Sequence, residues 1–264
     1  MNNKNTDQNY FEMNREGWDQ RAAAHLTSEF YDVKGFLDGG TSLCEIELAE
    51  LTGVAGKRLL HLQCHFGLDT LSWARMGAEC TGVDISPVAI RQARDISAQS
   101  GVEARFVCAN VLDFDRGDAE AFDIVYTSYG AICWLPDLDE WAGIVSSNLA
   151  DGGTFYMAEF HPVYDLLSGY SYFTRETPDV EEEGTYTENG DSVTGEFAVW
   201  SHPFSSVVNA LIKSGIGIVR VNEFPFSPYN CFENMEEREP GRFYIQHQSQ
   251  DIPLVYSLLG RKTG

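Results

Sequence analysis

Short apolar runs rich in β-branched and aromatic residues alternate along the chain with segments whose apolar positions recur every three or four residues. The alternation begins at Arg58 and continues to Phe160. It is typical of a parallel sheet with helices on both faces, so we predict an α/β fold of the doubly wound type. We expect strands at 58–64, 79–84, 104–110, 122–128 and 153–160, and helices at 67–76, 87–99 and 138–149.

The alternation stops at His161-Pro162 and resumes after His202-Pro203. The segment between them is rich in Tyr, Glu and Gly and is interpreted as an insertion. A helix at 204–214 and strands at 216–224 and near 254–259 are expected after it. The residues before the first strand contain helical stretches at 15–25 and 43–51, which must cover an edge or an end of the sheet. We therefore predict two parts, which are an N-terminal helical cap at 1–57 and an α/β domain at 58–264 with an inserted lid at 161–202.

The chain is strongly acidic, with 40 Asp and Glu against 18 Lys and Arg and a formal net charge of −22. A field of this sign repels a phosphate backbone, so we expect no nucleic-acid partner. The acidity is greatest at 176–191, which we interpret as a solvated loop. The six cysteines form no C-x-x-C pair, and no apolar signal or membrane segment is evident. We expect a cytoplasmic protein with no membrane partner, and we leave its oligomeric state open, with a homodimer as one option.

The stretch LLHLQCHFGLDT at 59–70 is the first candidate for a ligand site. It combines an expected strand, a turn at Gly67 and a helix start, whose free N–H groups bind anionic groups. In an open parallel sheet, ligands bind beyond the carboxyl ends of the strands. Asp84 ends the next strand, seventeen residues after Gly67, close to the spacing of about twenty at which an acid reaches ribose hydroxyls. Together they predict a ligand that contains a nucleoside.

The ends of the next two strands extend this candidate site. Asn110, Val111 and Leu112 follow the third strand, where an amide reaches an adenine edge and apolar side chains cover its face. Ser128 and Tyr129 follow the fourth strand, against the reactive end. The loop has one glycine where a dinucleotide fold has G-x-G-x-x-G, so the sequence argues against NAD and FAD and favours a nucleoside without a diphosphate.

These residues resemble the class I S-adenosylmethionine-dependent methyltransferases. The likeness covers nearly the whole chain, with LLHLQCHFG at the family's strand and loop, TGVDIS ending in its ribose-binding acid, and LADGGTFYMAEF in place of its L-x-P-G-G turn. It is nearest to a bacterial subgroup with the LQCHFG loop, a W-L-P-D segment and a late EFPFSPY segment. The resemblance implies a Rossmann-like, mainly parallel sheet of seven strands whose last strand is antiparallel. It also implies S-adenosylmethionine as cofactor, S-adenosylhomocysteine as product, and 58–264 as the methyltransferase domain.

The chain departs from this family in the cofactor loop. The family usually has an acid at the position of His61 and glycines at those of Gln63 and His65. More side chain and less bare backbone would therefore hold the methionine end of the cofactor. We predict that Gln63 and His65 bond its carboxylate or amine, and that Asp69 and Thr70 either do the same or cap the helix.

Aromatic side chains are expected around the positive sulfonium, because π faces attract cations and aromatic rings exclude water. The candidates are Trp18, Tyr31, Tyr129 and Trp134, and Ile85 joins the expected cofactor site as the neighbour of Asp84. A place in the core is the alternative for each of these rings.

The spacing H-x-x-C-H at His61, Cys64 and His65 raises two further possibilities, a zinc site and a cysteine nucleophile. Along a strand, His61 and Cys64 point to opposite faces, and no fourth ligand stands nearby at a useful spacing. The sequence places no base beside Cys64. We therefore expect no metal and interpret His61 as a strand histidine.

Three side chains are candidates for catalysis. His161 follows the fifth strand, at the rim where a general base would take a proton from a hydroxyl or ammonium acceptor. Tyr129 and His202 are the other two, and a structural role is the alternative for each, as it is for Glu159 at the same rim. We predict in-line methyl transfer to O or N of a small-molecule acceptor, mainly through proximity and alignment. The rival hypotheses are an S-adenosylmethionine-binding regulatory or sensor protein without transferase activity, a nicotinamide-dependent oxidoreductase and, least favoured without a G-x-S-x-G elbow, a hydrolase.

Overall fold

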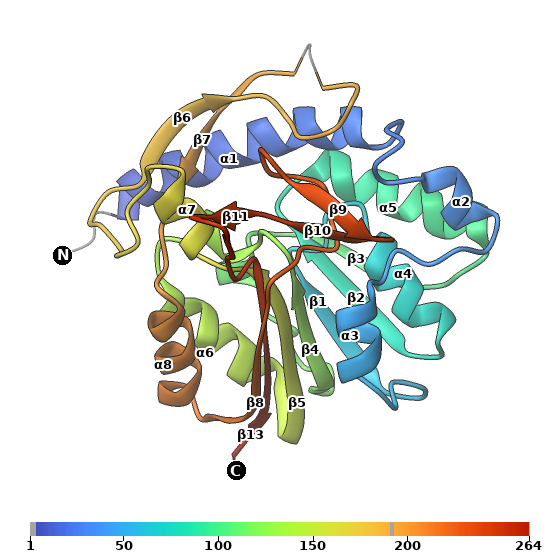
Figure 1. The fold of residues 1–264 in the computed structure, drawn as a ribbon. Helices are drawn as coiled ribbons and strands as arrows, with labels where there is room; N and C mark the ends of the chain where they lie inside the picture. Colours follow the sequence, from blue (N-terminus) through green and yellow to red (C-terminus); the bar gives the residue numbers. More distant parts are fainter. Residues whose placement is uncertain (1–3, 191–192, 264) are drawn as a thin grey trace.

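The computed structural model describes residues 4–190 and 193–263 of the chain. A seven-stranded sheet of order β3-β2-β1-β4-β5-β13-β8 forms its centre (Figure 1). Its strands are β1 Arg58–Leu62, β2 Glu79–Asp84, β3 Arg105–Cys108, β4 Phe122–Ser128, β5 Leu149–Phe160, β8 Ile216–Phe224 and β13 Val255–Lys262. β13 runs antiparallel to β5 and β8, whereas the pairs from β3 to β5 are parallel. The predicted doubly wound sheet with an antiparallel last strand is confirmed.

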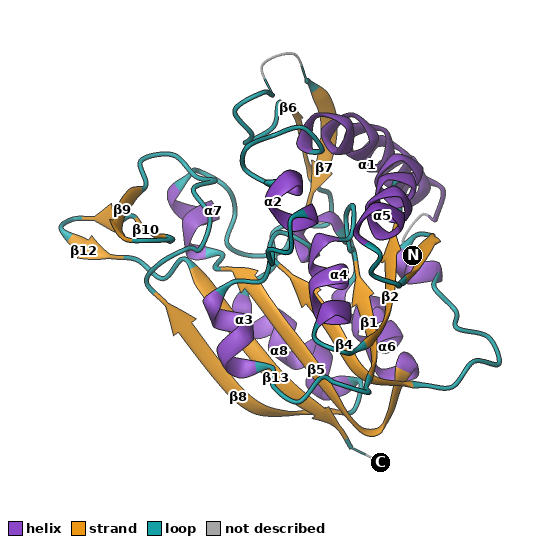
Figure 2. Ribbon diagram, turned by 90° about the vertical axis from the view of Figure 1, so that its right-hand side faces the viewer, coloured by secondary structure: helices purple, strands orange, loops and turns teal. Residues whose placement is uncertain are grey.

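Helices cover both faces of the sheet, as the layers in Figure 2 show. They are α3 Glu45–Glu50, α4 Leu68–Arg75, α5 Pro87–Ser100, α6 Leu138–Asn148 and α8 Phe204–Lys213. On one face, Trp141 of α6 and Val207 of α8 pack with Leu60 and Val125 of the sheet. On the other face, Ile46 of α3 and Trp73 of α4 pack with Leu59 and Ile124. The central strands are therefore apolar on both sides, which explains their nearly continuous hydrophobic runs.

The start of α5 illustrates how local sequence sets an element boundary. The Ser86 hydroxyl accepts a hydrogen bond from the N–H of Ala89 at 3.0 Å, and Pro87 occupies the first turn. A proline costs no hydrogen bond there, because first-turn N–H groups have no partner within the helix. Gly101 ends the helix with a φ of 68°. The predicted cap at Ser86 is confirmed.

The N-terminal segment is more helical than its pattern predicts. α1 spans Lys4–His25, and α2 at Val33–Leu37 precedes α3. α1 packs against α5 and against β7 of the insertion. The side-chain amide of Asn14 holds both backbone groups of Ala198, donating to its carbonyl at 2.9 Å and accepting from its N–H at 2.8 Å. The beginning of the chain is therefore joined to the insertion.

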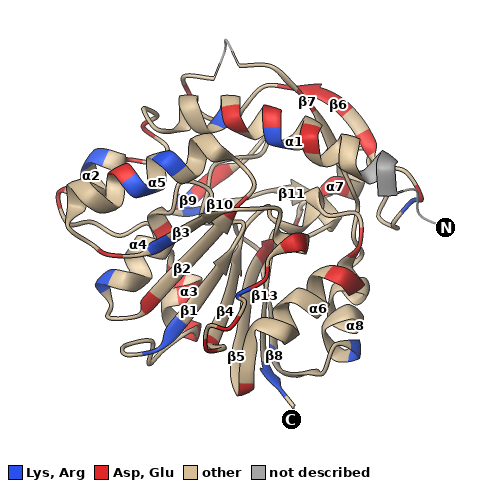
Figure 3. Ribbon diagram, turned by 180° about the vertical axis from the view of Figure 1, so that it is seen from behind, with Lys and Arg blue, Asp and Glu red and all other residues tan. Residues whose placement is uncertain are grey.

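The insertion contains a short helix and a hairpin, α7 Val163–Leu167, β6 Asp179–Glu183 and β7 Gly195–Val199. The prediction of a solvated loop at 176–191 is therefore partly wrong, because residues 179–183 of this segment form the strand β6. Asp191 lies outside the described residues. The red ribbon segments in Figure 3 mark the positions of Asp and Glu on β6 and α1. Four small strands, β9 Glu236–Glu239, β10 Arg242–Tyr244, β11 Gln246–His247 and β12 Gln250–Asp251, follow β8. Among the helices that the structure describes, none is long and apolar enough to cross a bilayer.

Candidate active site

A cavity of about 1430 Å³ lies beyond the carboxyl ends of β1, β2, β4 and β5. This exceeds the range of about 300–1,000 Å³ that is usual for one small-molecule site, so two small molecules fit side by side. The predicted site residues that line it are Trp18, Tyr31, Gln63, His65, Gly67, Asp69, Asp84, Ile85, Asn110, Val111, Ser128, Tyr129 and His202. The fold thus brings most of the residues singled out from the sequence into one cavity.

The loop between β1 and α4 has an unusual backbone. Gln63, His65 and Gly67 have φ angles of 57°, 51° and 79°, a region that side chains other than glycine rarely adopt. A Cβ atom at Gly67 would lie 2.5 Å from a ring carbon of Phe106. Only glycine fits this position, whereas the fold holds Gln63 and His65 in a costly conformation of the kind that gathers at functional sites.

The side chain of Gln63 is fixed at one end and free at the other. Its Nε2 donates to the carbonyl of Ala131 at 2.6 Å. Its Oε1 is buried and has no hydrogen-bond partner among the residues that the structure describes. A buried acceptor without a partner is costly, so a donor on a bound molecule would stabilise this arrangement.

Asp84 is fixed at the end of β2 by backbone donors. Its carboxylate accepts from the N–H of His65 at 2.8 Å and from that of Ser86 at 2.9 Å. Burial raises its pKa to about 6, although these two N–H bonds act in the opposite direction. Each oxygen retains further acceptor capacity, and Asp84 lines the cavity, so hydroxyl groups of a ligand have an acceptor there.

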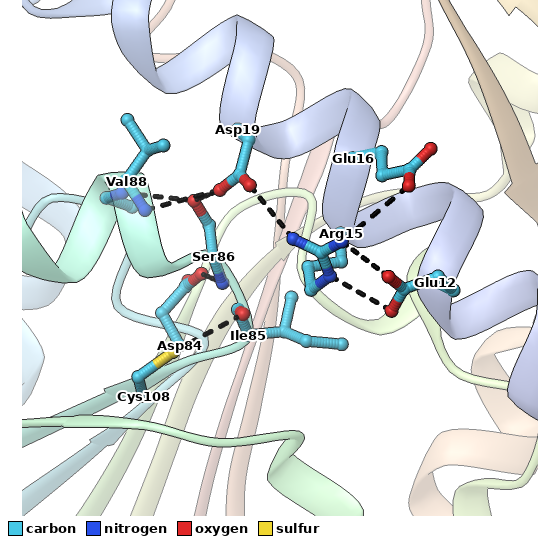
Figure 4. Close-up of polar contacts among 10 residues, drawn as sticks. Glu12, Arg15, Glu16, Asp19, Asp84, Ile85, Ser86, Val88 and Cys108 are labelled. Carbon is cyan, nitrogen blue, oxygen red and sulfur yellow. Dashed lines mark hydrogen bonds and ion pairs between the residues drawn. The ribbon is translucent and has the colours of Figure 1, made fainter.

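The helix α1 is tied to the chain beside Asp84 (Figure 4). One carboxylate oxygen of Asp19 accepts from the Ser86 hydroxyl and from the N–H of Val88, the latter at 3.2 Å. The other accepts from Arg15 at 3.1 Å. Negative charge at a helix N-terminus is stabilising, so Asp19 docks α1 on the start of α5.

Aromatic rings from α1 and its following loop stand over the cofactor loop. Trp18 lies edge to face with His65 and Trp134, at centroid distances of 5.4 and 5.3 Å. Tyr31 packs on Phe66 at 4.8 Å. All four sequence candidates, Trp18, Tyr31, Tyr129 and Trp134, line the cavity. Because the faces of aromatic rings attract cations, a wall of these residues suits a positively charged ligand.

A polar network lies beneath the loop and includes three of the predicted residues, Asp69, Thr70 and Ser128. Asp69 accepts from the hydroxyls of Ser42 at 2.6 Å and Ser128 at 3.2 Å. The Thr70 hydroxyl bonds Nδ1 of His61 at 2.9 Å. Neither Asp69 nor Thr70 caps α4, because the N-cap residue of this helix is Gly67 and no side chain bonds there. Thr70 is completely buried behind the lining, because its place on α4 faces the sheet rather than the cavity.

Leu112 is a second predicted residue that the structure does not bring to the cavity lining. It sits in the 3-10 turn η1 (Val111–Asp113) and packs in the core shared with α6. Asn110 caps this turn by accepting from the N–H of Leu112 at 3.1 Å. Val111 rather than Leu112 therefore presents its side chain to a bound molecule.

His161 also lies away from the cavity lining. Its Nε2 bonds Oε1 of Glu223 at 2.9 Å, and its Nδ1 accepts from the N–H of Val163 at 3.2 Å. Burial lowers its pKa, although Glu223 acts in the opposite direction. With both ring nitrogens engaged, His161 joins the end of β5 to β8 and has no free position for an acceptor's proton. The physical reason is that its side chain turns toward β8.

The other two catalytic candidates and Glu159 face the cavity. His202 donates from Nε2 to the carbonyl of Leu135 at 2.8 Å. Tyr129 donates its hydroxyl proton to Oε2 of Glu47 at 2.9 Å. Glu159 accepts from the backbone N–H groups of Ala131 and of its neighbours in the loop after β4, which fixes the shape of that loop.

The hairpin β6–β7 contributes residues to the cavity lining and contacts α1. The guanidinium of Arg21 bonds Glu183 at 2.9 Å and the carbonyl of Gly184 at 3.0 Å. It also lies 3.7 Å from the ring centroid of Phe197. Sequence reasoning missed Arg21, although an arginine in an otherwise acidic surrounding is a usable signal. Sequence reasoning also missed five further residues that line the cavity, Tyr164, Asp165, Glu181, Tyr229 and Phe232.

The spacing of His61, Cys64 and His65 raised the possibility of a zinc site. Within 4–190 and 193–263, no three His, Cys, Asp or Glu side chains come together in a way that could hold a metal ion. His65 instead bonds a ring nitrogen of His25 at 3.3 Å. The Cys64 thiol is buried, and burial raises its pKa, which makes it a poor nucleophile.

Comparisons with known proteins agree with this geometry. A family described as a methyltransferase domain matches residues 59–153, the segment that contains the loop, Asp84 and the ends of β3 and β4. Residues 59–153 are therefore similar in sequence to a methyltransferase domain. The ubiquinone biosynthesis O-methyltransferase of Xanthomonas axonopodis pv. citri (strain 306) is 30% identical over 150 residues, 55% of this chain and 61% of the relative. The chain thus spans about three fifths of the length of such curated relatives.

Solved methyltransferases share the fold. A SAM-dependent methyltransferase from Methanosarcina mazei superposes with a TM-score of 0.60 at 17% identity, over 84% of this chain and 98% of that one. A putative S-adenosylmethionine-dependent methyltransferase from Listeria monocytogenes gives 0.58 at 19%, over 83% and 97%. S-adenosylmethionine is the cofactor of this class of methyltransferase domain. The residues present fit it, since Asp84 offers carboxylate acceptors in the cavity lining and Gln63 offers an unused acceptor.

Proposed function

We propose that this protein transfers the methyl group of S-adenosylmethionine to an oxygen or nitrogen atom of a small-molecule acceptor. The single observation that carries the proposal is the shared cavity, in which a cofactor end at Gly67 and Asp84 continues into a chamber lined by Tyr164, Asp165 and Phe232. Curated relatives named as ubiquinone biosynthesis O-methyltransferases support transfer to oxygen.

The chain's own residues would orient the two molecules. Asp84 would accept from the ribose hydroxyls, and the free Oε1 of Gln63 would accept from the ammonium of the methionine end. The cofactor supplies a methyl group on a positively charged sulfur. Trp18 and Tyr31 would face that charge and exclude water. Alignment of donor and acceptor atoms then supplies most of the rate enhancement.

We also propose that residues 1–57 act as a cap and that 161–202 act as a lid. The contacts of Arg21 with Glu183 and of Asn14 with Ala198 support this, since they join the two segments over the cavity. An acceptor that enters this enclosed space has to be small. A cytoplasmic location and a homodimer stay predictions from the sequence.

Ligand binding and label transfer test the proposal. S-adenosylhomocysteine at one hundred times its dissociation constant should stabilise the native chain by about 2.7 kcal/mol, seen as a rise in melting temperature. Asp84→Ala should lose most of the rise. The matched control Asp95→Ala removes an exposed aspartate of α5 and should keep it. Methyl-labelled S-adenosylmethionine with a small-molecule cell extract should then yield a labelled product.

The rival hypotheses give different results in the same assays. Binding of the cofactor without label transfer to any acceptor would favour a sensor protein. Binding of NADH with no response to S-adenosylhomocysteine would favour an oxidoreductase. His161→Asn should bind the cofactor normally, because His161 lies away from the cavity lining.

A further inference from the structure

A buried carboxyl group lies behind the wall of the cavity. Glu47 of α3 has no exposed surface. One of its oxygens accepts from the N–H of Cys44 at 2.7 Å, and the other accepts from the Tyr129 hydroxyl at 2.9 Å. Tyr129 lines the cavity, whereas Glu47 does not. The side chain of Tyr129 therefore connects the cavity wall with the buried carboxyl.

The surroundings of Glu47 keep it largely neutral. Burial raises its pKa to about 8, and the nearby carboxyl of Asp69 on α4 adds to the rise, while the bonds from Cys44 and Tyr129 oppose it. The other titratable groups that face it are the hydroxyls of Tyr126 on β4, Tyr156 on β5 and Tyr229 after β8, together with the Cys44 thiol. None of these groups is a cation.

Tyr129 does not act as a base by ionising alone. Burial, together with Glu47, raises the pKa of its phenol well above the usual value. A hydroxyl that donates to Glu47 still has two lone pairs with which to accept. It therefore receives a proton from the cavity only while it gives up its own.

We propose that Tyr129 and Glu47 form a proton outlet for the methyl acceptor, with Tyr129 as the catalytic residue and Glu47 as the group that acts through it. This inference rests on the proposed function. The acceptor's O or N forms a bond to the methyl carbon, the carbon–sulfur bond breaks, and its electron pair stays on sulfur as a neutral thioether. The acceptor's proton passes to the Tyr129 oxygen, and the phenolic proton passes to the Glu47 carboxylate. The positive charge of the sulfonium and the negative charge of Glu47 disappear together, so charge balances.

Three other side chains near this part of the cavity could be considered as the base that takes the acceptor's proton. His161 has both nitrogens engaged, and His202 gives its Nε2 proton to a backbone carbonyl. Asp165 of α7 lines the cavity, and burial raises its pKa to about 6. It is the rival base, and a pH profile separates it from Glu47 because the two groups titrate about two units apart.

The test measures label transfer from methyl-labelled S-adenosylmethionine to the small-molecule extract between about pH 6 and about pH 9, where an essential base appears as a rise in rate. The wild-type rate should increase with pH up to about 8 and then level off. Glu47→Gln and Tyr129→Phe should each be at least about tenfold slower above that pH and should lose the rise. The double variant should be no slower than either single one.

A matched control lies on the same helix. Glu50 accepts from the hydroxyl of Tyr156 at 2.9 Å, as Glu47 does from that of Tyr129, but Tyr156 is completely buried away from the cavity. Glu50→Gln should keep the wild-type pH profile. Binding of S-adenosylhomocysteine, followed by thermal shift, verifies that each variant is folded, and Tyr129→Phe tests the outlet independently should Glu47→Gln fail to fold.

Two results would overturn the inference. One is a Glu47→Gln variant that keeps both the rate and the pH-dependent rise. The other is an Asp165→Asn variant that alone removes the rise. Failure of the proposed function looks different, since wild-type protein would then transfer no label at any pH, and the outlet would be rejected along with it.

Discussion

The backbone N–H of His65 donates a hydrogen bond to the carboxylate of Asp84 at 2.8 Å. This bond joins the turn after β1 to the end of β2. His65 adopts a φ of 51° in this turn. The acid and the strained loop therefore form one unit, and a change in either should be felt by the other.

Cofactor affinity should depend on the ionisation of Asp84. Its pKa is raised to about 6 by burial, so the carboxylate is present above that pH and is lost below it. An ionised acceptor forms a stronger hydrogen bond than a neutral one, about 1.5–3 against about 0.5–1.5 kcal/mol. We expect calorimetric titration with S-adenosylhomocysteine to show weaker binding as the pH falls through about 6. Asp84→Asn should bind weakly with little dependence on pH, and equal pH dependence in both proteins would contradict this role.

Gly67 should tolerate no side chain. An alanine there combines the strain of a φ of 79° with a Cβ atom 2.5 Å from Phe106. Gly53 is the matched control, because its φ is 71° and its Cβ would meet nothing within 4 Å. Gly53→Ala should cost about 1–2 kcal/mol of unfolding free energy through backbone strain alone. Gly67→Ala should cost about 1–3 kcal/mol more through overpacking.

Chemical denaturation of the two glycine variants, with and without S-adenosylhomocysteine, checks this prediction. Gly67→Ala should also lose the ligand's stabilising effect, whereas Gly53→Ala should retain it. Equal destabilisation of the two proteins would show that the close approach to Phe106 is unimportant.

Arg21 should hold the hairpin β6–β7 against α1. Its side chain is 5% exposed, pairs with Glu183 and lies over Phe197. Arg21→Gln should therefore speed amide hydrogen exchange in β6 and β7 while the exchange of β1 and β4 stays unchanged. Arg175→Gln removes an exposed arginine that pairs with Asp179 in the same insertion and should have little effect, as exposed pairs contribute about 0–1 kcal/mol. Similar exchange in both variants would argue against a special role for Arg21.

The unfolding free energy should depend on pH through the titration of Glu47. The folded-state pKa of about 8 lies above the ordinary value of 4.5 for a glutamate, so the folded protein holds this proton more tightly than the unfolded chain. The contribution of Glu47 is therefore most favourable below about 4.5 and declines until the pH reaches about 8. The melting temperature of Glu47→Gln, compared with that of the wild type, should rise across this window. A constant difference between the two proteins would show that Glu47 is ionised throughout.

The sequence predicts the sheet better than its coverings. The strand 122–128 is observed with the predicted bounds, because a continuous apolar run in a sheet covered on both faces has few alternatives. β5 instead begins at Leu149, which pairs with Phe122 across an irregular register that no sequence period encodes. α1 begins well before the predicted 15–25, because its first turns are polar and offer no periodic apolar face.

Site residues could be predicted from the sequence where they lie at strand ends. Contacts that depend on how helices pack on the sheet could not be predicted. The position of Asp84 follows from its place in TGVDIS. The contact of Glu47 with Tyr129 joins residues 82 positions apart and depends on how α3 packs on the sheet. His161 follows a strand end as well, but its side chain turns to Glu223 on β8, beyond the intervening strand β13, which the chain order alone does not reveal.

The pair of hydrogen bonds between Asn14 and Ala198 has a consequence for folding during synthesis. The partner of this early amide lies 184 residues downstream, so a ribosome has to make most of the polypeptide before α1 gains its final neighbour. Until then Asn14 and Gly17, which face Ala198 and Phe197 in the folded protein, have no partner on that side of the helix. Growth at low temperature or extra chaperone capacity should therefore raise the yield of folded enzyme. The increase should be larger than for a methyltransferase that lacks this contact between its N-terminal helix and a late segment.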